Sequence, residues 1–337
     1  MKSELVIEKF ADMMIQRMEQ MKDAQWQRGW IKTTFGDSPI NLRGTAYNGT
    51  NAFLLYLLCD LEGWKYPIFA TINQINECGG KVNKGAKSFP VIYWKVIYET
   101  KDGKRLDYKQ YSQLSEGEQN LCDIHPMLRS YNVFNVCQTN LEEVKPKAIE
   151  RLKARFGIKE PPTDTFGMYE NAEIDEMLGE QKWLCPIRWD QFSNRACYRP
   201  LTDDIVIPMK SQFFAGETDE ERYISGMRYY DVLLHEMAHS TGHETRLNRK
   251  SDHLFGSSEY AKEELVAELS GAICGQRLGF DHRLLDNNAC YLDSWIGCLK
   301  QEPRFIVSVL ADVNKAVRMI MNVVNKEQEE LVTVNEE

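Results

Sequence analysis

The sequence contains no long hydrophobic run. No stretch of its 337 residues reaches the roughly 18 consecutive apolar residues that a membrane-spanning helix needs. Residues 1–21 mix acidic with basic side chains and have no small-residue cleavage site, so they indicate an amphipathic helix rather than a secretory leader. These absences argue against a membrane protein and favour the cytoplasm.

Closely spaced cysteine pairs are also missing. The chain has nine cysteines, and no two of them have the Cys-x-x-Cys spacing of cysteine-ligated zinc sites. An odd number of cysteines, without a secretory leader, favours reduced thiols in a cytosolic protein. Zinc held by cysteine is therefore not expected.

The chain lacks an overall excess of basic residues, since 41 Lys and Arg face 50 Asp and Glu for a net charge of −9. A uniformly basic nucleic-acid binder is thereby excluded. The charge is uneven, however: residues 1–140 hold 17 basic and 15 acidic residues, and the remainder holds 24 and 35. Two regions with different electrostatic tasks are expected.

The length corresponds to about two domains. A charged stretch that ends at Pro161-Pro162 favours a boundary near the middle of the chain. We therefore predict an α+β protein with two domains. Its segments are a first domain at 1–140, a linker at 141–165, a second domain at 166–325 and an acidic tail at 326–337.

The spacing of apolar residues predicts elements in both halves. In the first half, helices are expected at 4–22, 51–62 and 71–78 and strands at 89–98 and 131–138, with a turn at Asp102-Gly103. In the second half, strands are expected at 183–189 and 204–208 and helices at about 225–242, 258–277, 288–301 and 303–325.

The strongest motif is LLHEMAHSTGH, at residues 233–243. His235 and His239 are four residues apart, so on a helix both rings can face one metal ion. Glu236 lies beside them and can take a proton from a water at that metal. This HExxH arrangement suits Zn²⁺. The chain has only six histidines, and three of them fall within this motif.

A third ligand has several candidates. Thr245 stands where one zincin group has a histidine, which leaves His243 or a glutamate of the following helix. Glu264 and Glu268 are four residues apart on one face of an otherwise apolar helix, where a carboxylate is costly unless it is paired or bound to metal. Of the candidates, Glu264 is favoured as the ligand over Glu263, Glu268 and His243. Glu268 and His243 would orient the metal ligands without contacting the metal themselves. Glu263 is expected to face solvent.

The surroundings of the motif give weaker signals. A zincin substrate lies along an edge strand beside the metal, and Tyr198 with the strand at 204–208 could supply that edge. Arg246, Arg249 and His253 follow the motif and are expected to be surface residues.

Residues 79–110 combine eight basic and three acidic residues with interleaved aromatics. A positive groove with stacking aromatics is typical of proteins that bind single strands without reading bases. Glycines beside Lys81 and Lys84 would let the backbone approach phosphates. By itself this pattern is also typical of a solvated lysine-rich hairpin whose aromatics pack in a core.

The two segments together resemble the ArdC-type antirestriction proteins, and the first half also resembles the leading domain of certain conjugative plasmid primases. The matching residues of the first half are Pro39 to Asn41, Tyr47 to Ala52, Trp64, Pro67, Phe69, Thr71, Gln74, Gly79, Gly80, Val82, Lys84, Gly85, Lys87, Pro90, Val91, Trp94, Val133 to Val136 and Gln138. Those of the second half are Tyr198, Asp204, His235 to His239, Thr241 to His243, Arg246, Leu247, Glu263 to Leu269, Tyr291, Leu292, Ser294, Trp295, Leu299 and Lys300.

The resemblance implies an N-terminal single-stranded DNA-binding domain, a C-terminal zincin-like metallopeptidase domain and a role in protecting incoming DNA from restriction. It supports a glutamate as third ligand. Candidate DNA-binding residues are Tyr47, Asn48, Asn51, Trp64, Lys81, Lys84, Lys87 and Trp94. The sequence departs from the pattern at Phe53, at Tyr56 and in the acids of 217–221, without loss of a motif residue.

The resulting hypothesis is a plasmid- or phage-borne antirestriction protein. It would bind single-stranded DNA and carry Zn²⁺ on His235, His239 and Glu264, with Glu236 activating water for hydrolysis of a protein such as a restriction component. The alternative is a DNA-masking protein whose zinc is structural or vestigial. A third possibility is a protease whose first domain grips a protein.

Overall fold

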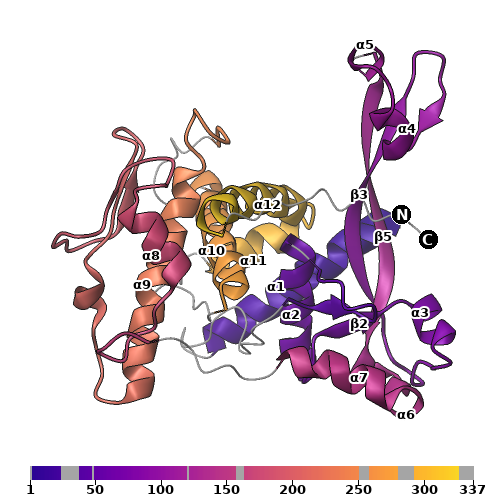
Figure 1. Cartoon of the computed structure of the whole chain (residues 1–337), viewed down its shortest axis with the longest axis horizontal. Coiled ribbons are helices and arrows are strands. Elements are labelled where there is room, and N and C mark those ends of the chain that lie inside the picture. The colour runs from indigo at the N-terminus through magenta and orange to yellow at the C-terminus, as the bar shows by residue number, and fades with distance from the viewer. Residues whose placement is uncertain are drawn as a thin grey trace.

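The computed structural model describes residues 2–23, 38–47, 49–119, 121–156, 163–249, 258–279 and 292–325. The structure contains both helices and strands. The strands form two sheets, which lie at opposite sides of a group of helices (Figure 1). None of the helices within these ranges is long and apolar enough to cross a membrane.

The larger sheet has five strands in the order β1-β2-β5-β3-β4. They are β1 (Ile40–Asn41), β2 (Ile68–Ala70), β3 (Phe89–Glu99), β4 (Arg105–Leu106) and β5 (Asp123–Asn135). The long antiparallel pairing of β3 with β5 runs from Phe89↔Val133 to Glu99↔Asp123. The outer half of this pair stands away from the helices as an arm, and α4 (Tyr108–Ser112) and α5 (Glu116–Gln119) lie at its tip (Figure 1).

The hairpin expected at Asp102-Gly103 is confirmed by the pairing of β3 with β4. The strand expected at 131–138 is longer at its start and ends earlier, at Asn135. The Asn135 side chain accepts the N–H of Cys137, while the Gln138 side chain accepts the N–H of Asn135. These two bonds turn residues 136–138 into a 3-10 helix.

The helices of the first half follow the apolar pattern. They are α1 (Lys2–Asp23), α2 (Gly49–Glu62), α3 (Ile72–Glu77), α6 (Leu141–Val144) and α7 (Pro146–Lys153). Thr71 caps α3, since its side chain accepts the Gln74 N–H at 3.2 Å while the Gln74 side chain accepts the Thr71 N–H at 3.0 Å. The expected cap at Thr71 is thereby confirmed.

The second half combines a small sheet with long helices. The sheet has the order β6-β8-β7, with β6 (Ile187–Arg188), β7 (Cys197–Arg199) and β8 (Asp204–Val206). The helices are α8 (Ala172–Gly179), α9 (Asp219–Ser240), α10 (Ser258–Arg277), α11 (Leu292–Gln301) and α12 (Phe305–Val324).

Two expected bounds in this half are wrong. The strand expected at 183–189 is only two residues long. The motif helix begins at Asp219 rather than near 225, because Thr218 caps it and exchanges hydrogen bonds with Glu221. Of the acids at 217–221, Asp219, Glu220 and Glu221 therefore lie in the first turn of α9, where negative charge is favourable.

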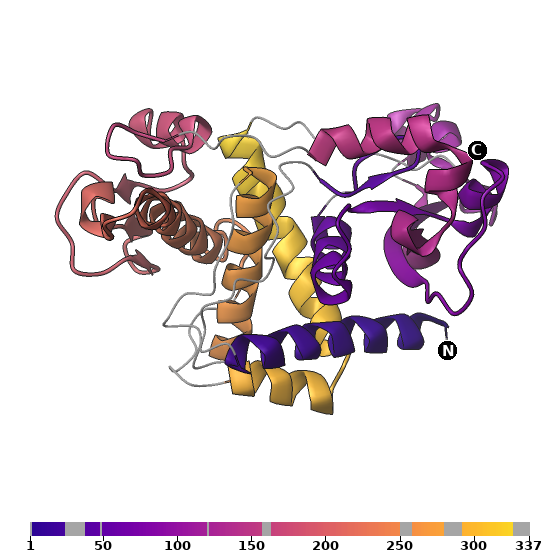
Figure 2. The same cartoon turned by 90° about the horizontal axis from the view of Figure 1, so that it is seen from below.

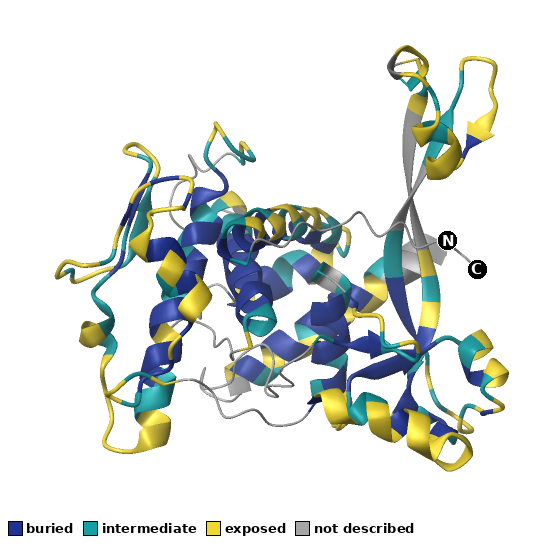
Figure 3. Cartoon of the chain, in the orientation of Figure 1, coloured by how far each residue is buried: buried dark blue, intermediate teal, exposed yellow. Residues whose placement is uncertain are grey.

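The core is continuous between the two halves. The first helix, α1, packs against α11 and α12 near the end of the chain (Figure 2). Lys22 and Lys300 tie these helices together through ion pairs with Asp293 and Glu19. Buried residues occupy the helical middle, and exposed ones line the arm tip (Figure 3). The domain division at 141–165 therefore stays a prediction, and the tail at 326–337 lies outside the described residues.

Candidate metal centre

Three side chains from α9 and α10 converge on one point. His235 and His239 lie on successive turns of α9, and their Nε2 atoms are 3.0 Å apart. Glu264 reaches them from α10, which packs beside α9. Its carboxylate oxygens lie 3.6 Å from the Nε2 of His235 and 3.6 Å from that of His239. These three are the group of metal-type donors found within the described residues.

Each imidazole ring is held at its other nitrogen by a second carboxylate of α10. His235 Nδ1 lies 3.5 Å from Glu268, and His239 Nδ1 lies 3.4 Å from Glu263. With their Nδ1 hydrogens toward these carboxylates, both Nε2 lone pairs face the Glu264 oxygens. Such convergence of acceptors is unfavourable unless a cation or proton sits among them.

The donor set fits a divalent metal. Two imidazole nitrogens and one carboxylate are ligands that zinc accepts. Ligand atoms about 2.0–2.2 Å from a tetrahedral Zn²⁺ lie roughly 3.3–3.6 Å from one another, close to the separations of 3.0 and 3.6 Å found here. Little rearrangement of the three side chains is needed.

The charges around His239 are strongly coupled. Burial lowers the pKa of His239, but the Glu263 hydrogen bond and the charges of Glu264 and Glu236 outweigh it and raise that pKa to about 9. Burial raises the pKa of Glu263, but Arg249 and His239 outweigh it and lower that pKa to about 2. Metal and proton therefore compete for His239.

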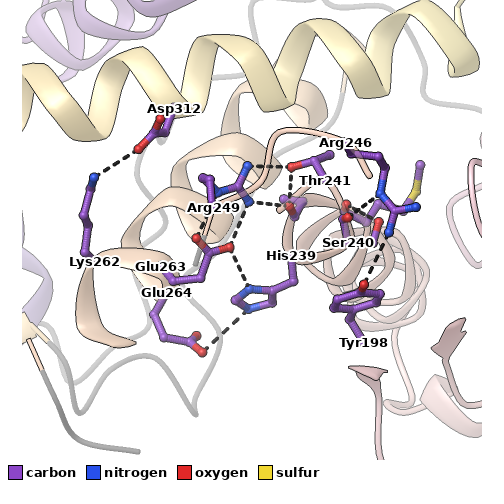
Figure 4. Close-up of polar contacts among 12 residues, drawn as sticks. Tyr198, His239, Ser240, Thr241, Arg246, Arg249, Lys262, Glu263, Glu264 and Asp312 are labelled. Atoms are coloured by element: carbon purple, nitrogen blue, oxygen red, sulfur yellow. Dashed lines mark hydrogen bonds and ion pairs between the residues drawn. The ribbon is translucent and has the colours of Figure 1, made fainter. Parts of the chain in front are cut away.

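Glu263 is not the solvated side chain expected from the sequence. Its side chain is 13% exposed and forms an ion pair with Arg249, whose Nε and Nη2 donate to the two carboxylate oxygens at 2.9 and 2.8 Å. Arg249 also donates to the Ala238 carbonyl and to the Thr241 hydroxyl at the end of α9. Figure 4 shows this chain of contacts from Arg249 through Glu263 to His239.

The expectation that Arg246 and Arg249 lie on the surface is also wrong, because both side chains are only 8% exposed. Arg246 forms an ion pair with Asp203 and donates to the Ser240 carbonyl and the Tyr198 hydroxyl (Figure 4). No spacing rule predicts these pairs, since each loop residue meets its partner only through the fold. His253 lies outside the described residues.

Glu236 faces the small sheet. Its Oε2 accepts a hydrogen bond of 2.6 Å from the backbone N–H of Tyr198 in β7. β7 is an edge strand, whereas β8 lies between β6 and β7. Tyr198 thus lies on an edge strand beside Glu236, whereas the strand at 204–208 is not at the edge; that a substrate lies along this edge stays a prediction.

The supporting role predicted for His243 stays a prediction. Its Nδ1 contacts the Thr245 hydroxyl at 2.8 Å and lies 3.9 Å from Asp203. The helix ends before it, at Ser240.

A loop of exposed lysines precedes the arm. We call residues 81–87 the lysine loop; Lys81, Lys84 and Lys87 are all exposed in it. The loop is pinned to the segment after β5, because the Asn140 side chain accepts the Lys81 N–H at 2.6 Å and the Gln138 side chain donates to the Lys87 carbonyl at 3.0 Å. Its backbone is therefore held in place although its three lysine side chains are exposed to solvent.

Other predicted DNA-binding residues make contacts within the protein. Tyr47 is buried against Phe69, and the Asn51 side chain bonds both the N–H and the carbonyl of Ile92 at the edge of β3. Trp64 is partly buried and also meets Phe69 edge-on. Asn48 and the side chain of Trp94 lie outside what the structure describes. The DNA-binding role of these five residues stays a prediction.

Of the five remaining bases of the 79–110 segment, four lie elsewhere, and the side chain of Lys95 lies outside what the structure describes. Lys101, Lys104, Arg105 and Lys109 are exposed at the arm tip. The whole tip, residues 98–123, carries four basic and six acidic residues. The basic residues that are close in the sequence are therefore separated in the structure. Among the described residues of this segment, an excess of positive charge is found in the lysine loop and not at the arm tip.

Two family models match the chain. Residues 4–134 match the N-terminal domain of the anti-restriction factor ArdC, and residues 176–312 match a zincin-like metallopeptidase family. The three converging side chains and Glu236 fall within the second match.

The chain is similar to solved and curated proteins along most of its length. The metal-free crystal structure of the antirestriction protein ArdC from the R388 plasmid aligns with a TM-score of 0.63 and 25% identity, and covers 93% of this chain and 97% of that one. The Mn(II)-bound structure of the same protein aligns with a TM-score of 0.62 and 25% identity, over 94% and 99% of the two chains. A DNA primase TraC of Escherichia coli is 31% identical over 94% of this chain, which spans only 27% of that primase.

Proposed function

The chain is an ArdC-type protein with a zincin-like domain, and we propose from this premise that it is an antirestriction protein that binds single-stranded DNA and hydrolyses a protein at a divalent-metal centre. Restriction components are the protein class that such a role would target. Both activities go beyond the family membership and rest on separate observations.

One observation carries the metallopeptidase half: three donors converge, with atoms 3.0 to 3.6 Å apart, beside a fourth polar side chain, Glu236. In this proposal His235, His239 and Glu264 hold the metal, with Zn²⁺ favoured by the mixed nitrogen and oxygen donors. The Mn(II)-bound structure of the R388 protein supports a divalent ion in chains of this type.

A metal in this position supplies Lewis acidity and lowers the pKa of a bound water toward about 7. The chain's own residues do the rest. The Tyr198 N–H fixes one oxygen of Glu236, so the carboxylate is oriented to take a proton from the attacking water and return it to the leaving amine. The Tyr198 carbonyl lies at the same edge of β7, which pairs with no further strand within the described residues, so it can accept an N–H of an extended substrate.

The DNA half rests on the lysine loop. Its three exposed ammonium groups sit on a pinned backbone, which suits contacts to successive phosphates. Because Tyr47, Asn51 and Trp64 contact other protein groups, we expect phosphate contacts to contribute more than base stacking.

Glu236→Gln tests the metallopeptidase half. The amide keeps the size of the side chain but cannot act as a base, so hydrolysis of a protein substrate should fall by about 10² to 10⁴-fold. Metal content, measured by mass spectrometry of the purified chain, should stay at the wild-type level. Unchanged antirestriction activity in this variant would instead favour the alternative, a DNA-masking protein with a structural metal.

A mobility-shift assay with a single-stranded oligonucleotide tests the DNA half. A complex should form at low salt and weaken as salt rises, because phosphate binding releases counterions. Absence of a complex at low salt would contradict the proposal. Capture of a protein rather than DNA by residues 1–140 would favour the third possibility, a protease that grips a protein.

A further inference from the structure

The outer face of the small sheet carries an arginine pocket that the proposed mechanism does not use. We define the arginine pocket by Arg188, Phe192, Arg195, Cys197 and Arg199, which line one depression in the surface. The pocket lies in the half of the chain that has more acidic than basic residues, yet three guanidinium groups line it.

The strand register explains why Arg188, Cys197 and Arg199 share a face of the sheet, and Phe192 and Arg195 reach the same depression from the loop between β6 and β7. Arg188, Val206 and Cys197 stand directly opposite one another across β6, β8 and β7, and Arg199 pairs with Asp204 one step further along the sheet face. The other face carries Ile187 and Ile205, both buried. The alternation of a strand therefore points the arginines to solvent while the isoleucines enter the core.

One carboxylate balances part of this charge. Asp204, whose side chain is 4% exposed, forms ion pairs with both Arg188 and Arg199. Among the described residues, Arg195 has no ion-pair partner, and its loop is held by hydrogen bonds between Ser193 and Gln212. The pocket thus presents an exposed guanidinium group, on a loop whose backbone is held, that is open to an anion.

The arginine pocket adjoins the candidate metal centre through β7. Cys197 and Arg199 flank Tyr198, whose N–H is bonded to Glu236. A peptide paired with the free edge of β7 would place its residues opposite Cys197 and Arg199 on the arginine-bearing face, because directly opposed residues point to the same side. The side chains of that peptide opposite Cys197 and Arg199 would then lie beside the pocket.

We propose that the arginine pocket binds a carboxylate side chain of the protein substrate, so that hydrolysis occurs beside an acidic residue. This inference rests on the proposed metallopeptidase function. The planar fork of arginine matches a carboxylate in two parallel hydrogen bonds, which gives selectivity as well as affinity.

Peptide binding to the metal-loaded full chain tests the proposal. The probes are short labelled peptides of one length that carry Glu, Gln or Lys at alternate positions. Their affinity for the chain is measured by fluorescence anisotropy. A Glu236→Gln background prevents turnover during the measurement. The Glu peptide should bind about tenfold more tightly than the Gln peptide, and Arg195→Ala should remove most of this difference.

Two controls define the result. Arg43→Ala removes an exposed arginine of the first half and should leave the preference unchanged. Arg195→Lys keeps the charge but loses the fork, and should retain only part of the preference. Equal binding of Glu and Gln peptides, or an Arg195→Ala variant that loses single-stranded DNA rather than the Glu peptide, would overturn the proposal.

The two proposals can fail separately. If the chain with an intact Glu236 cleaves none of the peptides while Arg195 still selects the Glu peptide, the pocket is upheld and the proposed hydrolysis is contradicted. If it cleaves Gln and Glu peptides at equal rates, hydrolysis is upheld and the pocket assignment is contradicted.

Discussion

The candidate metal centre and the lysine loop differ in how their side chains are held. In the metal centre, each histidine has a carboxylate partner on α10: the buried Glu268 for His235, and Glu263, whose side chain is 13% exposed, for His239. In the lysine loop, hydrogen bonds fix only the backbone, and the ammonium groups are free in solvent. The metal centre suits the binding of a single ion at one point. The lysine loop suits a flexible polyanion that can bind in several registers.

The largest expected effect tests whether the centre is a metal site. Glu264→Ala removes one of three donors, so the metal bound per chain should fall from about one ion to nearly none, because two histidines alone rarely retain zinc. Mass spectrometry after dialysis measures it. Glu244→Ala, an exposed acid just beyond the motif, is the matched control and should retain full metal. Full retention in Glu264→Ala would rule out this ligand.

The second prediction concerns the buried partners. Glu263→Gln keeps the shape of the side chain but loses the charge that pairs with Arg249 and orients His239, so metal affinity should fall by about 10–100-fold. Competition with a metal-binding dye measures it. An unchanged affinity would mean that packing alone holds the ring of His239. The metal centre would then not differ from the lysine loop in having its side chains held by polar partners.

The third prediction tests the lysine loop as a cooperative set of phosphate contacts. Replacement of Lys81, Lys84 and Lys87 together by Ala should reduce the slope of log affinity against log salt by about 2, at roughly 0.7 for each contact with a single strand. Affinity should fall for every oligonucleotide sequence alike. A loss restricted to particular sequences would indicate base reading and contradict this view.

The smallest effect is expected at the arm tip. Ala at Lys101, Lys104 and Arg105 removes as many charges as the previous change, but from a segment with more acids than bases. Affinity for single-stranded DNA should therefore change by less than about twofold. A loss equal to that of the lysine-loop variant would show that the arm, rather than the loop, carries the DNA.

Much of the helical structure follows from the spacing of apolar residues. The bounds of α10 agree with the expected 258–277, and Thr71 caps α3 as expected. Errors occur where side chains compete with the backbone. Asn135 and Gln138 end β5 early, and Thr218 with Glu221 starts α9 early. Such competition depends on single hydrogen bonds, which periodicity does not report.

The candidate DNA-binding residues do not form one surface in the structure, and the cause is the path of the backbone rather than local hydrogen bonds. A run of bases along the sequence predicts a basic surface only if the backbone keeps the run together. The antiparallel pairing of β3 with β5 instead carries the later bases along the arm and places them beside acids at the tip. The aromatic residues Tyr47 and Trp64 meet Phe69 in the core, which composition alone does not distinguish from a stacking surface.

The sequence by itself determined the helix that presents His235 and His239, since four residues bring side chains to the same face of any helix. It also favoured Glu264 as the third ligand, from the burial cost that it shares with Glu268 on an apolar helix. Only the tertiary structure decided that Glu263 pairs with Arg249, that β7 rather than β8 forms the edge beside Glu236, and that three arginines meet on one sheet face. Those relations join segments distant in the chain, and strand order and helix packing, not local spacing, set which of them meet.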